Sequence, residues 1–442
     1  MSATLGDMDL AASFLRPSGR SKVHQVVSSG GGAEVQLQVR GYVGDHVDLS
    51  PDISAHLYKV LRGGRHLVFI NRKSQVEAYS AALRDKCVRT RVPNEFLPHH
   101  GSLSKELRED AEQRLRAGEL PTTVICSSTL ELGIDIGNVE SVAQVGGPIG
   151  VASMRQRLGR SGRRGGASVL RTYVEEPAVT PKTAVPDLLR WELVETTAMV
   201  ELLIARWIEP PGDRALHLST LVQQTLSVIA EYGGRRAEWI WEHLCGGGPF
   251  QLVSRSMFAA LLRALGQRDL VVQTSDGVLL LGVVGERLVN HYEFYTAFAT
   301  PEEYRIEHEG RALGAIPIYH TLLPGGMITF AGKRWVVLAI NEEQGRIEVR
   351  PGPAGPVPHF FGGGAPVHDR VRQEMFRLYV RPEVPRYLDG TARTLLSEGR
   401  GHFHRMKLQE RAIVEDGFGC WCSCGVETRL STQSSRCCGY ET

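Results

Sequence analysis

The sequence of 442 residues has few of the features that would assign it to a specialised class of protein. No apolar run reaches the roughly 18 residues that span a bilayer, and residues 1–10 lack the basic segment and apolar stretch of a signal peptide. With 42% apolar and 23% charged residues, the chain is neither disordered nor fibrous. A net charge of +2 does not mark a nucleic-acid binder either, because the clear cases are strongly basic. We therefore expect a cytoplasmic protein of about two to four domains.

Lysine is also rare, since only eight of the 51 basic residues are lysines and the others are arginines. Arginine binds phosphate through a planar fork of donors rather than as a point charge. A GC-rich genome produces the same bias, so the composition alone does not identify a ligand.

The region from residue 60 to 175 alternates between predicted strands and helices. Gly118 is typical of a helix end, and Ser74 of a helix cap. Such alternation predicts a parallel sheet covered by helices, with ligands at the carboxyl ends of the strands. The expected strands cover residues 67–70, 123–126, 139–145 and 168–174, and the expected helices begin near residues 74, 104 and 151.

The remainder of the chain predicts smaller units. A proline-rich linker at 177–186 precedes an expected amphipathic helix at 187–207. Helices and then a hairpin, with its turn at Asp276-Gly277, indicate a winged helix between about 215 and 285. Strands dominate from 290 to about 385 and predict a small β-rich domain, which a helix at 390–401 follows.

Polar and charged segments lie where this sheet would present a site. Phe69–Lys73 follows the first predicted strand, Ser127–Ile136 follows a later one, and Gln156–Arg164 closes the last helix. In the last segment Arg160 and Arg163 stand one helical turn apart, a pattern that suits a polyphosphate whose charge is redistributed during a reaction. For this segment alone, a solvated basic helix end is an alternative.

A glycine precedes each of these two arginines. Gly159 and Gly162 precede Arg160 and Arg163, and glycine allows a ligand or another backbone to approach closely.

Together the three segments resemble motifs IV, V and VI of the superfamily-two helicases, in that order and at the expected spacing. His99–Lys105 and Leu132–Asp135 are similar to the large helicase-related (Lhr) branch of that superfamily. The resemblance continues into Phe294–Tyr304 and Pro358–Gly362, and it covers nearly the whole chain to about residue 416.

The resemblance implies a multidomain α/β plus α+β fold: a RecA-like parallel-sheet lobe, a winged helix and a small, barrel-like β-rich domain. The domain boundaries that we expect are 1–176 for the second RecA-like lobe, 177–213 for a linker and connecting helix, 214–286 for the winged helix, 287–416 for the β-rich domain and 417–442 for a tail.

The resemblance also implies roles for individual residues at ATP. Arg160 and Arg163 would reach the γ-phosphate, with Gln156 beside them. Gly133 and Asp135 would lie near the nucleotide, and Asp135 would couple it to the nucleic-acid groove.

Other residues would contact nucleic acid. The resemblance implies that Arg72, Ser128 and Thr129 hold the phosphate backbone of the tracked strand, a contact without sequence preference. An aromatic side chain could stack on a base. The candidates for stacking, each of which is also compatible with a core position, are Trp239, Trp241 and Trp335.

One departure from the family pattern concerns catalysis. The P-loop G-x-x-x-x-G-K-[ST] and the acidic Mg²⁺ motif are absent, and Gly332-Lys333 is followed by Arg334. Ser2–Asp7 looks like motif III, which follows those elements in the family. The resemblance is thus to the C-terminal part of such an enzyme, with ATP and Mg²⁺ held mainly by a first lobe that these residues do not include. We expect no ATP hydrolysis by this chain alone.

A second departure is the cysteine-rich tail, which holds five of the eight cysteines: Cys420, Cys422, Cys424, Cys437 and Cys438. Alternate or adjacent cysteines fit the C-x₂₋₄-C spacing of structural zinc sites poorly, so we expect no metal. A shifted reading frame from Cys420 onward is the favoured interpretation, because permitted codons then give a strand and helix that continue the resemblance. A genuine metal site and a neutral tail are the alternatives.

The sequence therefore predicts the C-terminal part of an ATP-dependent 3′-to-5′ DNA translocase and helicase. It would track on single-stranded or tailed duplex DNA during repair or nucleic-acid processing, in the cytoplasm at the nucleoid and away from membranes. Two alternatives remain open. One is a non-catalytic nucleic-acid-binding module that docks a separately encoded ATPase lobe, and the other is an RNA helicase.

Overall fold

The computed structural model describes most of the chain. The residues described are 6–15, 23–25, 34–46, 48–131, 136–137, 139–162, 166–181, 183–210, 216–295, 303–317, 324–341, 344–352, 367–410, 413–416 and 419–422.

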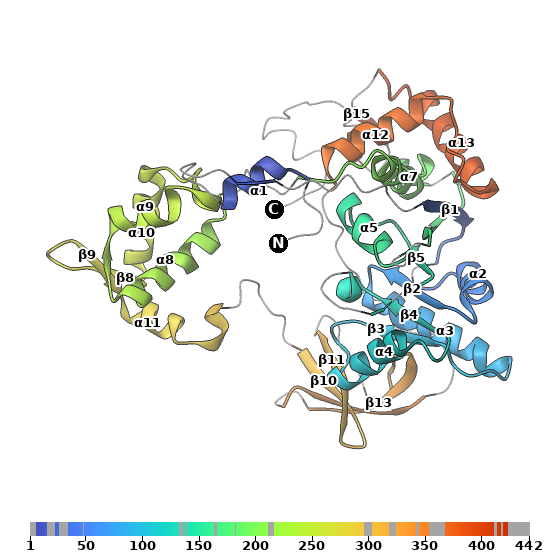
Figure 1. The fold of residues 1–442 in the computed structure, drawn as a ribbon, viewed down its shortest axis with the longest axis horizontal. Helices are drawn as coiled ribbons and strands as arrows, with labels where there is room; N and C mark the ends of the chain where they lie inside the picture. The colour runs from blue at the N-terminus through green and yellow to red at the C-terminus, as the bar shows by residue number, and fades with distance from the viewer. Residues whose placement is uncertain are drawn as a thin grey trace.

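A parallel sheet forms the centre of one part of the molecule (Figure 1). Its strands are β1 (Val35–Val43), β2 (Arg65–Ile70), β3 (Phe96–His99), β4 (Thr122–Cys126), β5 (Ser141–Val145) and β6 (Ser168–Glu176). They lie in the order β1-β6-β5-β2-β4-β3, and each neighbouring pair is parallel. Every residue of β4 and β5 is buried, as expected for strands that helices cover on both faces. The predicted α/β class is confirmed.

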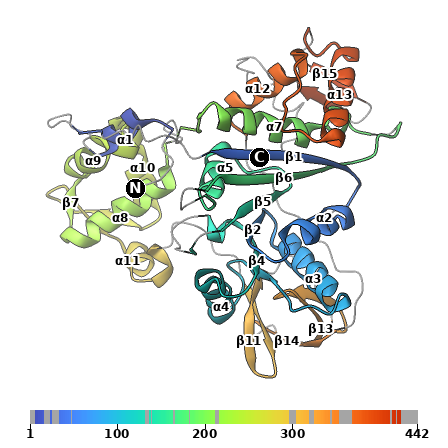
Figure 2. The same cartoon turned by 45° about the vertical axis from the view of Figure 1, so that its right-hand side comes forward.

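Helices cover both faces of this sheet (Figure 2). The alternation of side chains along β2 separates the two cores, because Val68 and Ile70 pack on one face and Leu67 and Phe69 on the other. The first face is covered by α2 (Pro51–Leu61) and α3 (Lys73–Arg89), and the second by α4 (Lys105–Ala117), α5 (Val151–Leu158) and α7 (Trp191–Ile204).

The predicted helix caps are correct in α4 and wrong in α3. Ser104 accepts a hydrogen bond from the Leu107 amide at the start of α4, and Gly118 ends that helix with a φ of 67°. In α3 the N-cap is Arg72, without a side-chain cap bond, and Ser74 already lies inside the helix. The Ser74 hydroxyl instead donates to Asp48, at 3.3 Å.

The single amphipathic helix expected at 187–207 is two helices in the structure. A short α6 (Val185–Leu188) ends before Arg190, which has a φ of 54°, and α7 follows. Helix α7 is buried around most of its circumference rather than along one stripe. Two later helices account for this extra burial.

Those helices, α12 (Asp369–Val380) and α13 (Gly390–Arg405), return to the sheet (Figure 1). Val371 and Leu378 of α12 and Leu395 of α13 belong to the same core as α7. The Val39 amide of β1 also donates to the Tyr387 carbonyl, at 2.9 Å. The expected unit 287–416 is therefore incorrect as one packing body, because its helices pack on the parallel sheet. We call residues 34–204 together with 367–410 the α/β lobe.

A separate helical unit lies to one side of the α/β lobe (Figure 1). It contains α8 (Leu218–Tyr232), β7 (Arg235–Arg236), α9 (Ala237–Cys245), α10 (Arg255–Gln267), β8 (Val271–Gln273), β9 (Val278–Leu281) and α11 (Val283–Val289). The strands pair in the order β7-β9-β8, and Gly277 has a φ of 84° in the expected hairpin turn. Helices closed by a small antiparallel sheet are the arrangement of a winged helix. A core of its own includes Leu226, Ile240 and Phe258.

A second, mostly antiparallel sheet contains β10 (Glu303–His308), β11 (Arg311–Pro317), β12 (Met327–Phe330), β13 (Lys333–Asn341) and β14 (Arg346–Pro351). We call it the β-sheet domain; its strands lie in the order β11-β10-β14-β13-β12. It docks on the α/β lobe, where the Ala315 amide donates to the Ser102 carbonyl and the Ser104 amide donates to the Leu313 carbonyl, both at 2.8 Å. The predicted β-rich unit is thus present and is held by the segment between β3 and α4.

The α-helix and strands not yet named are α1 (Met8–Leu15) and an antiparallel pair, β15 (Ile413–Asp416) and β16 (Gly419–Cys422). The backbone of Cys420 and Cys422 lies in β16, whereas Cys424, Cys437 and Cys438 lie outside the described residues. The interpretation of the tail therefore stays a prediction. Among the described helices, none combines the length and apolar character needed to cross a membrane.

Candidate functional site

A buried arginine connects the segments that the sequence places at the carboxyl edge of the sheet. Arg157 of α5 is 1% exposed, and its guanidinium lies 4.8 Å from the centre of the Phe69 ring. Its Nε and Nη2 each lie 2.9 Å from the Glu131 carboxylate, which follows β4. Its Nη1 donates to Gln144 of β5 and, at 3.4 Å, to Asn71 after β2. One side chain thus ties α5 to the ends of three strands.

The motif pattern predicts no role for Arg157 or Glu131, although both lie in the helicase-like segments. A signal was present, because Val151, Met154 and Leu158 define the buried face of α5 and Arg157 lies on that face. A charge on a buried helix face requires a partner, which is Glu131 here.

Arg160 lies against the same segment. It is 7% exposed, and its Nε and Nη2 donate to the Glu131 backbone carbonyl at 3.2 and 2.6 Å. Gln156, on the preceding turn, is half-buried. Two of the residues predicted for phosphate binding thus lie about one turn apart at the end of α5, and one of them, Arg160, contacts the segment after β4.

Only one of the two glycines in this segment needs to be glycine. Gly162 has a φ of 75°, and a Cβ there would lie 2.5 Å from the Ser168 hydroxyl. Gly159 has ordinary helical backbone with a φ of −65°. The close approach expected at both positions is thus required at Gly162 alone.

Glu209, which lies in the connection between α7 and the winged helix, caps the start of α5. The amides of Val151 and Ala152 donate to the two carboxylate oxygens of Glu209, at 2.6 and 2.7 Å. A carboxylate at this position satisfies free amides and complements the helix dipole. Helix α5, which carries Gln156 and ends two residues before Arg160, is therefore fixed at both ends.

Ser128 and Thr129 lie in a short 3₁₀ helix directly after β4. Ser128 is exposed and Thr129 is half-buried. The Thr129 hydroxyl lies 2.8 Å from Nδ1 of His99, whose Nε2 lies 2.9 Å from the Glu112 carboxylate. Burial lowers the pKa of His99 below its usual range, against the opposing effect of Glu112.

Arg72, the third predicted backbone contact, is exposed at the end of β2. Its neighbour Asn71 donates to the Gly147 carbonyl at 2.7 Å, which ties this turn to the end of β5. Arg72 and Ser128 therefore both present their side chains to solvent at the same edge of the sheet, since β2 and β4 are neighbouring parallel strands.

Three predicted site residues, Gly133, Asp135 and Arg163, lie outside the described residues. Within the part of the chain that the structure describes, no group of His, Cys, Asp and Glu side chains could hold a metal ion.

The three tryptophans considered for base stacking differ in their surroundings. Trp335 is 4% exposed in the core of the β-sheet domain, and its Nε1 donates to the Phe330 carbonyl at 2.7 Å. It is a core residue and cannot stack on a base. Trp239 stacks on His243 with ring centres 4.7 Å apart, and Trp241 carries the Arg255 guanidinium over its ring.

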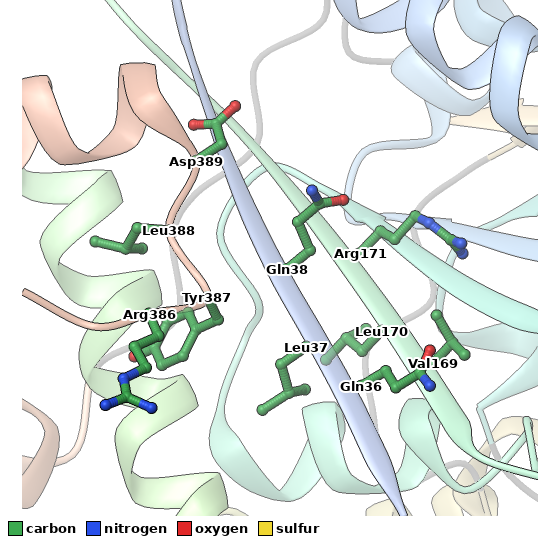
Figure 3. Close-up of a pocket in the computed structure, with 10 residues that line it drawn as sticks. All are labelled: Gln36, Leu37, Gln38, Val169, Leu170, Arg171, Arg386, Tyr387, Leu388 and Asp389. Atoms are coloured by element: carbon green, nitrogen blue, oxygen red, sulfur yellow. The ribbon is translucent and has the colours of Figure 1, made fainter.

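A cavity of about 340 Å³ lies away from the residues around Arg157 and Glu131 (Figure 3). Residues 36–38 of β1 and 169–171 of β6 line one side, and residues 386–389 before α13 line the other. None of the predicted site residues lines it. It marks the seam where the returning chain packs on the edge strand of the sheet.

Comparison with known proteins gives a consistent relationship. Residues 51–165 match the family model described as helicase conserved C-terminal domain. The chain is 30% identical to the Lhr helicase/uracil glycosylase of Escherichia coli over 60% of this chain and 18% of that protein. It is 25% identical to the ATP-dependent helicase Lhr-Core protein 2 of Thermococcus barophilus over 88% of this chain and 46% of that protein. The chain thus spans less than half the length of these relatives.

Solved structures show the same fold. The Mycobacterium smegmatis helicase Lhr bound to single-stranded DNA and AMP-PNP matches with a TM-score of 0.60 and 23% identity, over 93% of this chain and 50% of that one. The helicase MrfA bound to DNA and AMPPNP matches with a TM-score of 0.52 and 16% identity, over 72% of this chain and 42% of that one.

The chain thus combines three features. Its parallel strands lie in the order given above, motif segments follow their carboxyl ends, and most of the chain is similar in sequence to Lhr proteins. The chain is therefore similar in sequence to Lhr helicases of superfamily two, and its parallel sheet has the fold of a RecA-like helicase C-terminal lobe.

Proposed function

We propose that this chain provides the second motor lobe, the winged helix and the β-sheet domain of an ATP-dependent helicase that moves 3′ to 5′ along single-stranded DNA. The observation that carries the proposal is the Arg157–Glu131 contact, which joins the three helicase-like segments at one edge of the sheet. Such enzymes act in nucleic-acid repair or processing, so we place the protein at the nucleoid.

The nucleotide side of the site consists of Arg160 and Gln156, with Arg163, Gly133 and Asp135 proposed from the motif pattern. Guanidinium and amide donors suit the phosphates of ATP. ATP and Mg²⁺, when bound, supply the phosphoryl group and its charge neutralisation, mainly through another lobe. Arg160 would stabilise the negative charge that develops on the γ-phosphate.

The nucleic-acid side consists of Arg72, Ser128 and Thr129. A cation and two hydroxyls at neighbouring strand ends can bind successive phosphates without reading bases. Glu131 lies between the two sides, since its carboxylate binds Arg157 and its carbonyl binds Arg160. A shift of Arg160 toward phosphate would therefore displace the segment that holds Ser128 and Thr129.

This chain alone should bind single-stranded DNA weakly and should not hydrolyse ATP, because its 442 residues contain no P-loop. The alternatives share the binding prediction: a stand-alone module that docks a separate ATPase lobe, or an RNA helicase. Competition between DNA and RNA oligonucleotides of one sequence, at one salt concentration, distinguishes a DNA helicase from an RNA helicase.

The test measures binding of a fluorescent single-stranded oligonucleotide at several salt concentrations, together with phosphate release from ATP. Arg72→Ala should weaken binding and reduce the slope of log K against log salt by about 1, because one phosphate contact is lost. Arg89→Ala removes an exposed arginine at the opposite end of the same helix and should leave the slope unchanged. If Arg72→Ala and Arg89→Ala changed the affinity and its salt dependence equally, the proposed position of the binding site would be wrong. DNA-stimulated ATP hydrolysis that Arg160→Ala abolishes would contradict the inactivity of the chain alone.

A further inference from the structure

The histidine behind Thr129 has no role in the proposed function so far. His99 is 1% exposed and lies between Glu112 of α4 and Thr129. Both of its ring nitrogens make contacts, so its protonation state decides which partner donates and which accepts.

The direction of each bond follows from counting protons. An ionised Glu112 can only accept, so Nε2 of His99 must carry a hydrogen. In a neutral ring Nδ1 then carries no hydrogen, and it accepts a hydrogen bond from the Thr129 hydroxyl. The other neighbour of that hydroxyl is the His99 carbonyl, at 3.2 Å, which also only accepts. While His99 is neutral, the one hydrogen of Thr129 therefore points into the protein.

Protonation of His99 reverses one of these bonds. Nδ1 then donates to the Thr129 oxygen, and the hydroxyl hydrogen is no longer bound to the ring. A phosphate oxygen is a better acceptor than the remaining carbonyl, because hydrogen bonds to ionised groups are stronger. The charged groups that face His99 are Glu112 and Arg108 of α4 and the neighbouring His100.

We propose that His99, held by Glu112, is a positioning residue that sets the direction of the Thr129 hydroxyl, so that protonation of His99 turns this donor toward a nucleic-acid phosphate and strengthens binding. The proposal rests on the proposed function, because it takes Thr129 to be a phosphate contact.

The first test needs no nucleic acid. Nuclear magnetic resonance of the full chain with ¹⁵N-labelled histidine should show His99 as the neutral Nε2–H tautomer at mildly alkaline pH, and His99→Gln identifies its signal. In Glu112→Gln the new amide can either donate to Nε2 or accept from it, so both neutral tautomers are allowed and the excess of the Nε2–H form should be lost. A Nδ1–H tautomer in the unaltered chain would overturn the proposal.

The second test measures affinity for a labelled single-stranded thymidine oligonucleotide between about pH 4.5 and 8 at constant ionic strength, a range that extends downward because burial lowers the pKa of His99. Affinity should rise by about tenfold as the pH falls, the factor that one hydrogen bond to a charged group contributes. Thr129→Val should lose this added rise. Glu112→Gln should bind more tightly than the unaltered chain at pH 8 and should depend less on pH, because part of its His99 is then the Nδ1–H tautomer.

A matched control removes the general effect of charge. Glu109→Gln takes one carboxylate from the exposed face of the same helix, where 61% of the side chain is accessible, and should keep the normal pH dependence. In a Thr129→Val background, Glu112→Gln should change affinity no more than Glu109→Gln does. The same pH dependence with and without the Thr129 hydroxyl would overturn the proposal. Absence of binding at every pH would instead contradict the proposed function, while the tautomer measurement would still decide the position of the proton.

Discussion

Arg157 brings a full positive charge into the core of the α/β lobe, among Phe69, Gln144 and Glu131. A buried ion pair contributes little net stability compared with apolar residues, but removal of one partner leaves a buried charge without compensation. Arg157 is therefore better described as a residue that fixes the geometry of the site than as one that binds a ligand.

Arg157→Met should lower the free energy of unfolding of the lobe by about 3–5 kcal/mol, because the Glu131 carboxylate loses its ion pair. Urea unfolding followed by circular dichroism measures this change. Arg155→Met removes an exposed arginine from the same helix and should change the free energy by less than about 0.5 kcal/mol. Similar losses in both variants would show that the pair has no special structural role.

Glu176 gives the lobe a dependence on pH. It is 2% exposed at the end of β6 and accepts a hydrogen bond from the Leu193 amide, and burial raises its pKa from 4.5 to about 7. The folded state therefore binds this proton more tightly than the unfolded state does. Stability should fall as the pH rises from about 4.5 to about 7, and it should stay lower above that range.

Glu176→Gln keeps the acceptor for Leu193 and removes the charge. It should raise the free energy of unfolding by about 2–3 kcal/mol at pH 8 and by little at pH 4. Denaturant unfolding of both proteins across this range measures the difference. A stabilisation that is the same at every pH would exclude titration of Glu176 as its cause.

Among the elements, the dock between α3 and the β12–β13 turn depends on one buried carboxylate. Glu77 is 3% exposed, accepts from the amides of Ala331 and Gly332, and lies 2.8 Å from Nε2 of His100. A second link, Arg334 to Asp85 at 3.2 Å, lies nearer the surface. The buried link should hold the two units together, because exposed ion pairs contribute little.

Glu77→Gln should increase hydrogen exchange at the Ala331 and Gly332 amides by about tenfold or more, since an uncharged acceptor binds them less strongly. Asp85→Asn should leave these amides nearly as protected as before. Exchange measured residue by residue, with β4 as an internal reference, distinguishes the two. Equal loss of protection in both variants would place the dock at the surface pair.

The elements also show which features can be predicted from the sequence. Apolar runs such as 123–126 mark buried parallel strands, and Gly118 marks a helix end, because each signal is local. The position of α12 has no local signal. Its face of Val371, Met375 and Leu378 requires a cover, but the cover is α7, far away along the chain. The contact between His99 and Thr129 likewise appears only once β3 and β4 pair.

At the scale of the molecule, the chain forms at least two bodies with separate cores. Leu395 of α13 lies in the core of the α/β lobe, and Phe258 of α10 lies in that of the winged helix. Unfolding should therefore not be a single two-state event.

Leu395→Ala should destabilise the α/β lobe by about 2–5 kcal/mol and leave the winged helix unchanged, because the cavity forms in one core only. Phe258→Ala should do the reverse. Hydrogen exchange of β5 and of α8 under mild denaturant reports the two bodies separately. Loss of protection in both bodies from either substitution would mean that they unfold together.

The return of α12 and α13 to the α/β lobe affects how the protein is made. On the ribosome β1 emerges well before α13, the helix that packs on it, because β1 ends at Val43 and α13 begins more than 300 residues later, at Gly390. The winged helix and the β-sheet domain emerge in between and can fold first, because their contacts are more local. During translation the nascent α/β lobe therefore exposes an unfinished core, and it is the part of the chain that most needs a chaperone.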